Sequence, residues 1–144
     1  MARYDASIEI DASPEAIFPY LVEPDRLKRW VGGFEEAHPQ TPGPTGLGSR
    51  SIDVIREGGR ELRLETEITG YEAPFGLSVT ITGPGMDAVS NYRIEPIGSG
   101  SRVSHVQRVR YGGVLRVIGP LMGGMVRRKL REDLLGLKTA VEEA

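Results

Sequence analysis

The alternation of apolar and polar side chains between residues 49 and 111 limits the folds open to this chain more than any other feature. Segments with a period of two are typical of strands that bury one face. They cover residues 49–56, 60–71, 77–82, 89–97 and 102–111. Short glycine-containing turns separate them, such as Gly58-Gly59 and Gly98-Ser99-Gly100-Ser101. Strands spaced in this way predict one curved antiparallel sheet.

The region before this sheet predicts a strand and two short helices. Residues 3–11 alternate like a half-buried strand. Ser13 then suits a helix N-cap, and Pro14 suits the first helical position. Pro19 removes a backbone donor inside this helix, so we expect it to be short or kinked. A second helix start follows at Glu23-Pro24-Asp25.

From Val114 onward the apolar residues follow a helical period. One stripe consists of Val114, Val117, Ile118, Leu121 and Met125, and a second of Val126, Leu130, Leu134, Leu137 and Val141. The change between them falls at Gly123-Gly124, just after Pro120. We therefore predict two helical segments, or one helix bent at these glycines.

Length and composition predict one soluble globular domain over residues 1–144. The absence of cysteine excludes a disulfide scaffold, a thiolate zinc site and a cysteine nucleophile. The longest apolar stretch, residues 114–126, contains Arg116 and is shorter than the roughly 20 residues of a membrane span. The charged N-terminus does not look like a signal peptide, so we expect no transmembrane segment and a cytoplasmic location.

The order of strand, two short helices, a run of strands and a long C-terminal helix resembles a known architecture. It resembles the helix-grip fold of the START / Bet v 1-like (SRPBCC) superfamily, in particular its polyketide cyclase/dehydrase and lipid transport-like members and its carbon monoxide dehydrogenase subunit-like members. The motifs that carry the resemblance lie at residues 8–18, 24–30, 46–50 and 92–103 and in the final amphipathic helix. The resemblance implies an α+β fold in which the sheet wraps around the C-terminal helix and leaves a hydrophobic cavity. It does not select a reaction, because this superfamily includes carriers, cyclases and adaptors.

The main functional prediction is the binding of a hydrophobic small molecule, such as a lipid or polyketide, in that cavity. The inward faces of the strands supply a mostly apolar wall with a few polar groups, as is typical of ligand pockets. The candidate ligand-binding residues are Trp30, Leu62, Leu64, Thr66, Ile68, Leu77, Val79, Ile81, Tyr92, Ile94, His105, Gln107, Val109, Tyr111, Met122 and Met125. Trp30 and the two methionines are expected near the mouth of the cavity or the helix that covers it.

A second hypothesis is an aromatase/cyclase- or dehydratase-like enzyme. His105 is the only histidine on a predicted inward face and could act as a general acid or base, with Tyr92 beside it. The alternative is a packed histidine without chemistry, since no carboxylate is predicted next to it. His38 and His105 do not have the spacing of a metal site, so we expect no metal and no cofactor.

A third hypothesis is an adaptor that docks on a membrane or a partner protein through its basic C-terminal surface. Residues 97–131 contain 8 basic and no acidic side chains, although the whole chain has a net charge of −2. Arg127, Arg128 and Arg131 are expected to face solvent, opposite the second stripe. We expect instead that the apolar stripes pack on the sheet and that the basic surface is only solvated. The basic residues lack interleaved aromatics, so we expect no nucleic-acid binding, while a homodimer stays open.

Overall fold

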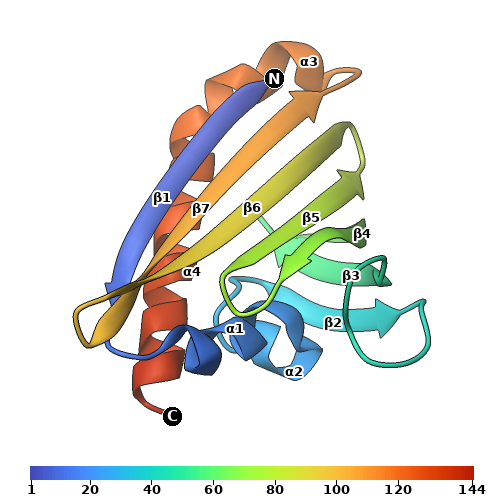
Figure 1. Cartoon of the computed structure of the whole chain (residues 1–144). Coiled ribbons are helices and arrows are strands. Elements are labelled where there is room, and N and C mark those ends of the chain that lie inside the picture. Colours follow the sequence, from blue (N-terminus) through green and yellow to red (C-terminus); the bar gives the residue numbers. More distant parts are fainter.

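The computed structural model describes all 144 residues and contains a curved seven-stranded antiparallel sheet with a long helix on one face (Figure 1). The strands are β1 (Ala2–Ile10), β2 (Phe34–Pro39), β3 (Arg50–Glu57), β4 (Arg60–Glu72), β5 (Gly76–Gly83), β6 (Met86–Ile97) and β7 (Gly100–Tyr111). The helices are α1 (Pro14–Val22), α2 (Pro24–Leu27), α3 (Leu115–Ile118), the 3₁₀ turn η1 (Gly119–Met122) and α4 (Gly123–Glu142). This arrangement confirms the predicted α+β helix-grip fold.

The sheet brings the first and last strands together in the order β1-β7-β6-β5-β4-β3-β2. Strands β2 to β7 follow one another as neighbours, and β1 pairs with β7 from Ala2↔Val109 to Ile10↔Ser101. The N-terminal strand is therefore fixed at one edge of the sheet, while β2 forms the other edge.

Two short helices follow β1, as predicted. The Ser13 hydroxyl accepts a hydrogen bond from the backbone N–H of Ala16 at 3.3 Å, which caps α1. Pro19 lies inside α1, and the helix ends only three residues later, at Val22. Pro24 then begins α2.

Helix α4 packs on the β1 side of the sheet, where its second apolar stripe lies in the core. Leu130, Leu134, Leu137 and Val141 are buried, and Val126 is half-buried. Leu134 and Leu137 belong to the same core cluster as Ile94 and Val103 of the sheet. We call the sheet face that carries α4 the inner face and the opposite face the outer face.

The prediction that the first stripe also packs on the sheet is wrong. Val114, Val117, Leu121 and Met125 are between 67% and 84% exposed, and Ile118 is 46% exposed. Val114 directly precedes α3, Val117 and Ile118 belong to α3, Leu121 belongs to η1, and Met125 lies in the first turn of α4. Segment α3 lies at the end of the molecule that holds the N-terminus (Figure 1). Only the second stripe, which follows α4 from Val126 to Val141, packs on the sheet.

Sequence alternation missed one strand and shortened another. Strand β2 pairs with β3, but its charged and polar residues Glu35, Glu36 and His38 give it no alternation, and a register shift interrupts the pairing between Phe34 and Glu36. Strand β6 begins at Met86, three residues before the predicted start. In β2 few apolar side chains mark the inner face, whereas the start of β6 does carry two, Met86 and Ala88, which pack with Tyr111 and Val109.

Candidate functional site

The strand residues predicted to bind a ligand lie together on the inner face. Cross-strand partners point to the same side of a sheet, and the register pairs Tyr92 with His105 and with Leu77. On β4 and β5 it pairs Ile68 with Val79 and Thr66 with Ile81. The sheet therefore assembles these side chains on one surface.

Several of the predicted residues are part of the packed core. Ile68, Leu77, Ile94 and Val109 are at most 9% exposed. Trp30 is also buried, and its indole N–H donates a hydrogen bond of 2.8 Å to the carbonyl oxygen of Tyr20. These side chains hold the core together, and Trp30 lies within it.

Other predicted residues form a surface that α4 leaves partly open. Leu62, Leu64, Thr66, Val79 and Ile81 are half-buried. They belong to β4 and β5, whereas α4 packs mainly on β1, at the other edge of the sheet (Figure 1). We call these five residues the inner-face patch. Four of its five side chains are apolar, and none of the five is fully buried.

A stack of rings lies beside this patch. The imidazole of His105 stacks on the ring of Tyr92 at 4.0 Å between centroids, with 16° between planes. Tyr92 in turn meets Trp30 edge to face at 6.3 Å. His105 is 5% exposed, and its Nε2 atom has no hydrogen-bond partner. A buried nitrogen without a partner is uncommon and costly in a folded protein, so it calls for an explanation.

Burial, with a smaller contribution from the charge of Lys129, lowers the pKa of His105 to about 4. The imidazole is therefore neutral at pH 7. Burial, and then the charge of Asp133, raises the pKa of Tyr92 above its usual value. Both rings of the stack are uncharged and can only act through hydrogen bonds and packing.

An ion pair on α4 supplies the two charges that influence the stack. The Nζ atom of Lys129 lies 2.8 Å from Oδ2 of Asp133, one helical turn away. The same pair holds Gly32, because Lys129 donates to its carbonyl oxygen at 3.2 Å and Asp133 accepts from its N–H at 3.0 Å. We call these three residues the α4 clasp. It ties α4 to the connection between α2 and β2.

The remaining polar candidates have partners within the protein. The side-chain amide of Gln107 donates to the hydroxyl of Ser90 at 3.2 Å, and the hydroxyl groups of Tyr111 and Tyr4 lie 3.2 Å apart. Burial, followed by the hydrogen bond to Tyr4, raises the pKa of Tyr111 to about 12. Tyr111 thus remains a neutral hydrogen-bonding group at pH 7.

One acidic group on the inner face was missed from the sequence. Asp53 of β3 pairs with Leu64 in the register and is half-buried. The hydroxyl of Ser51 donates to its carboxylate at 2.7 Å. Burial raises the pKa of Asp53, while the Ser51 hydrogen bond and the charge of His38 oppose this rise. The alternation of residues 49–56 identifies two faces, but only the pairing with β4 shows that Asp53 lies on the inner one.

The two methionines do not lie together at a lid. Met122 is half-buried at the end of η1, whereas Met125 is 67% exposed. Met125 thus belongs to the exposed first stripe. It does not face the sheet core.

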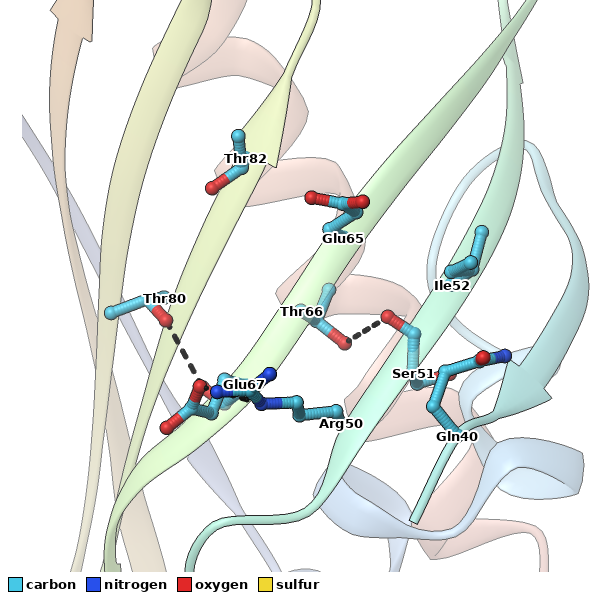
Figure 2. Close-up of a pocket in the computed structure, with 9 residues that line it drawn as sticks. All are labelled: Gln40, Arg50, Ser51, Ile52, Glu65, Thr66, Glu67, Thr80 and Thr82. Atoms are coloured by element: carbon cyan, nitrogen blue, oxygen red, sulfur yellow. Dashed lines mark hydrogen bonds and ion pairs between the residues drawn. The ribbon is translucent and has the colours of Figure 1, made fainter.

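A depression of about 440 Å³ lies on the outer face, across β3, β4 and β5 (Figure 2). It is lined by Gln40, Arg50, Ser51, Ile52, Glu65, Thr66, Glu67, Thr80 and Thr82, of which only Ile52 is hydrophobic. Arg50 and Glu67 form an ion pair across it at 3.0 Å. Among the predicted ligand-binding residues only Thr66 borders it. A site with this polar lining does not suit the apolar ligand that the sequence predicts.

The histidines and carboxylates of the chain do not gather into a metal-binding cluster. No three His, Asp or Glu side chains come together in a way that could hold a metal ion. His38 instead lies 2.9 Å from the carboxylate of Glu36 on the exposed strand β2. None of the helices has the length and apolar character needed to cross a membrane.

Comparisons with known proteins agree with the fold. The family model described as polyketide cyclase / dehydrase and lipid transport matches residues 1–142. No curated protein matches the sequence. The crystal structure of TTHA0849 from Thermus thermophilus is similar with a TM-score of 0.78 and 19% identity, covering 99% of this chain and 98% of that one. Ara h 8.0201 is similar with a TM-score of 0.77 and 12% identity, and CV1439 from Chromobacterium violaceum with 0.73 and 17%; each comparison covers 99% of both chains. At these identities the solved structures show a shared fold.

Proposed function

Because the chain belongs to the polyketide cyclase / dehydrase and lipid transport family, we propose that it binds a hydrophobic small molecule between the inner face of the sheet and α4. The observation that carries this proposal is the inner-face patch, which is only partly buried and lies beside a buried His105 nitrogen without a partner. Apolar side chains with one or two polar groups among them are typical of small-molecule sites. The ligand we expect is an elongated apolar molecule with one neutral polar group.

Each part of such a ligand has a counterpart on the inner face. Leu62, Leu64 and Ile81 offer apolar surface to its hydrocarbon part. The neutral imidazole of His105 would exchange one hydrogen bond with its polar group through Nε2. Filling that unsatisfied position would add to the binding energy.

The test uses N-phenyl-1-naphthylamine, a neutral apolar probe whose fluorescence rises in apolar sites. We expect saturable binding of one probe per chain by the wild-type protein. Leu64→Gln should weaken it by roughly tenfold, since about 1.5 kcal/mol of apolar burial is removed. Arg63→Gln is the matched control, because Arg63 is the neighbouring residue of β4 and its exposed side chain lies on the outer face.

Absence of saturable binding by the wild-type protein would overturn the proposal. Equal weakening by Leu64→Gln and Arg63→Gln would overturn the assignment to the inner face. Thermal unfolding of both variants ensures that only folded proteins are compared. Native mass spectrometry of the purified protein would then identify any ligand that it retains.

A cyclase- or dehydratase-like enzyme is the second candidate, and the free Nε2 of His105 beside the Tyr92 ring is the observation that favours it. Against it, burial and the charge of Lys129 lower the pKa of His105 to about 4, which makes the imidazole a weak base at neutral pH. A linear polyketone thioester would separate the two functions. Formation of a cyclised or dehydrated product by the wild-type protein, lost in His105→Gln, would support the enzyme. Binding with recovery of the unchanged linear thioester would support the carrier.

A further inference from the structure

The exposed first stripe forms an apolar surface at one end of the molecule. Val114, Val117 and Leu121 are 75%, 77% and 84% exposed, and Met125 is 67% exposed. Met1, at 70% exposure, lies at the same end, as Figure 1 shows for the N-terminus and α3. We call these five residues the end patch. Monomeric proteins rarely leave large apolar side chains exposed as a contiguous group unless the group binds something.

Packing beneath the segment prevents these side chains from turning inward. Gly119 is buried and lies so close to the ring of Tyr111 that no Cβ atom would fit between them. Leu115 approaches Gly85 in the turn between β5 and β6. Residues 115 and 119 thus fix one side of the α3–η1 segment on the sheet, and the end patch is the opposite side.

The charges around the end patch are positive. No acidic residue occurs between Glu95 and Glu132. Arg116, within α3, and Arg127, in the first turns of α4, are exposed and form no ion pair. The Arg127 guanidinium lies over the ring of Tyr4 at 5.4 Å. Arg110 is also exposed, although the register places it opposite Asp87.

Arg128 and Lys129 contribute less to this positive surface than the sequence suggests. Arg128 pairs with Glu132 at 2.9 Å, and Lys129 belongs to the α4 clasp. Arg116 and Arg127, the cations closest in sequence to the exposed apolar side chains, are therefore unpaired, as is Arg131 further along α4. This proximity distinguishes the end patch from a general basic surface.

We propose that the end patch docks on an anionic lipid bilayer, with Arg116 and Arg127 at the level of the phosphate groups. Amphipathic segments bind in this way when apolar side chains enter the boundary between headgroups and acyl chains and flanking cations meet acidic lipids. A second copy of this chain is a poorer occupant, because a symmetric contact would bring the same arginines together. The proposal does not depend on ligand binding at the inner face.

The first test measures sedimentation of the protein with vesicles. We expect binding to phosphatidylcholine vesicles that contain roughly one third phosphatidylserine, and little binding to pure phosphatidylcholine. Raising the salt from about 0.1 M to about 1 M shortens the Debye length from about 10 Å to about 3 Å and should weaken binding strongly. Failure to bind anionic vesicles, or equal binding to both kinds, would overturn the proposal.

Variants then locate the docking surface. The double variant Val117→Gln/Leu121→Gln should weaken vesicle binding at least tenfold, while Leu135→Gln, at an exposed leucine of α4 outside the end patch, should leave it unchanged. Arg116→Gln should weaken binding about fivefold, and Arg63→Gln on the outer face of β4 should not. An equal loss in the control variants would overturn the assignment. A dimer in solution that the double variant dissociates would replace the bilayer by a second copy.

Discussion

Replacement of Gly119 by alanine tests the packing that holds α3 and η1 on the sheet. Gly119 has helical backbone angles, φ −52° and ψ −48°, so alanine introduces no backbone strain. Its added methyl group would instead meet the Tyr111 ring, with Cδ1 only 2.6 Å and Cδ2 only 2.7 Å away. The ring belongs to a strand, and its hydroxyl contacts Tyr4, so it has little freedom to move. Overpacking of this kind costs about 1–3 kcal/mol.

Gly124 provides a matched control in the same region. It lies in the first turn of α4, and a Cβ atom there would meet nothing within 4 Å. Alanine is a better helix former than glycine by up to about 1 kcal/mol. Gly119→Ala should therefore lower the free energy of unfolding, while Gly124→Ala should leave it unchanged or raise it.

Guanidinium denaturation and thermal unfolding, both followed by Trp30 fluorescence, measure the two effects. Trp30 is the only tryptophan and is buried in the core, so its emission reports global unfolding. For a chain of this length, about 1 kcal/mol corresponds to a change in Tm of roughly 3 °C. Gly119→Ala should thus lower Tm by roughly 3–9 °C.

A double-mutant cycle with Tyr111→Ala identifies the cause. Without the ring, the added methyl group has room, so Gly119→Ala should cost little in the Tyr111→Ala background. The reasoning is refuted if Gly119→Ala is as stable as the wild type. It is equally refuted if the cost remains when the ring has been removed.

Three further predictions concern the core beside the inner-face patch. The pKa of His105 falls from 6.5 to about 4 on folding, so the unfolded chain binds the proton more tightly. The contribution of His105 to the free energy of unfolding should therefore be complete above pH 6.5. It should decline by about 3 kcal/mol as the pH falls to 4. Urea denaturation at several pH values should show this decline, and His105→Gln should abolish it. Lys129→Met removes a cation that disfavours the imidazolium, so it should raise the pKa of His105 in an NMR titration; an unchanged or lower value would contradict the assigned charge effect. Trp30→Phe leaves the carbonyl of Tyr20 without its buried donor and should cost about 2 kcal/mol in denaturation followed by circular dichroism, and a loss below about 0.5 kcal/mol would contradict this role.

The sheet could be predicted from the sequence because each central strand buries one face and exposes the other. Strand β4 alternates over Leu62, Leu64 and Thr66, and this pattern assigned its inner face before any pairing was known. Strand β2 has no such contrast, since Glu36 and His38 are exposed and a bulge interrupts its pairing. Alternation therefore fails at this edge strand, where neither face is fully buried, but succeeds at the other edge strand, β1, because α4 covers one of its faces.

The site was less predictable because it depends on how neighbouring strands pair and on which part of the sheet α4 covers. Asp53 shares the inner face with Leu64 only through the pairing of β3 with β4. The α4 clasp joins residues about 100 positions apart, Gly32 and Asp133, through hydrogen bonds that no local pattern indicates. A period also shows which residues of a helix share a face, but not what covers that face. This is why the first C-terminal stripe was wrongly expected to be buried.

The break between η1 and α4 explains how one C-terminal segment can have a core stripe and an exposed stripe. Met122, with φ −90° and ψ 5°, departs from helical geometry, so the apolar positions before it are out of phase with those after it. Leu130, Leu134 and Leu137 are fixed by the sheet, whereas Val117 and Leu121 contribute little buried surface to the fold. Substitutions at these two exposed positions should therefore change what the surface binds without unfolding the protein. The separation of the two stripes thus allows the docking surface to be tested independently of both the core and the inner-face patch.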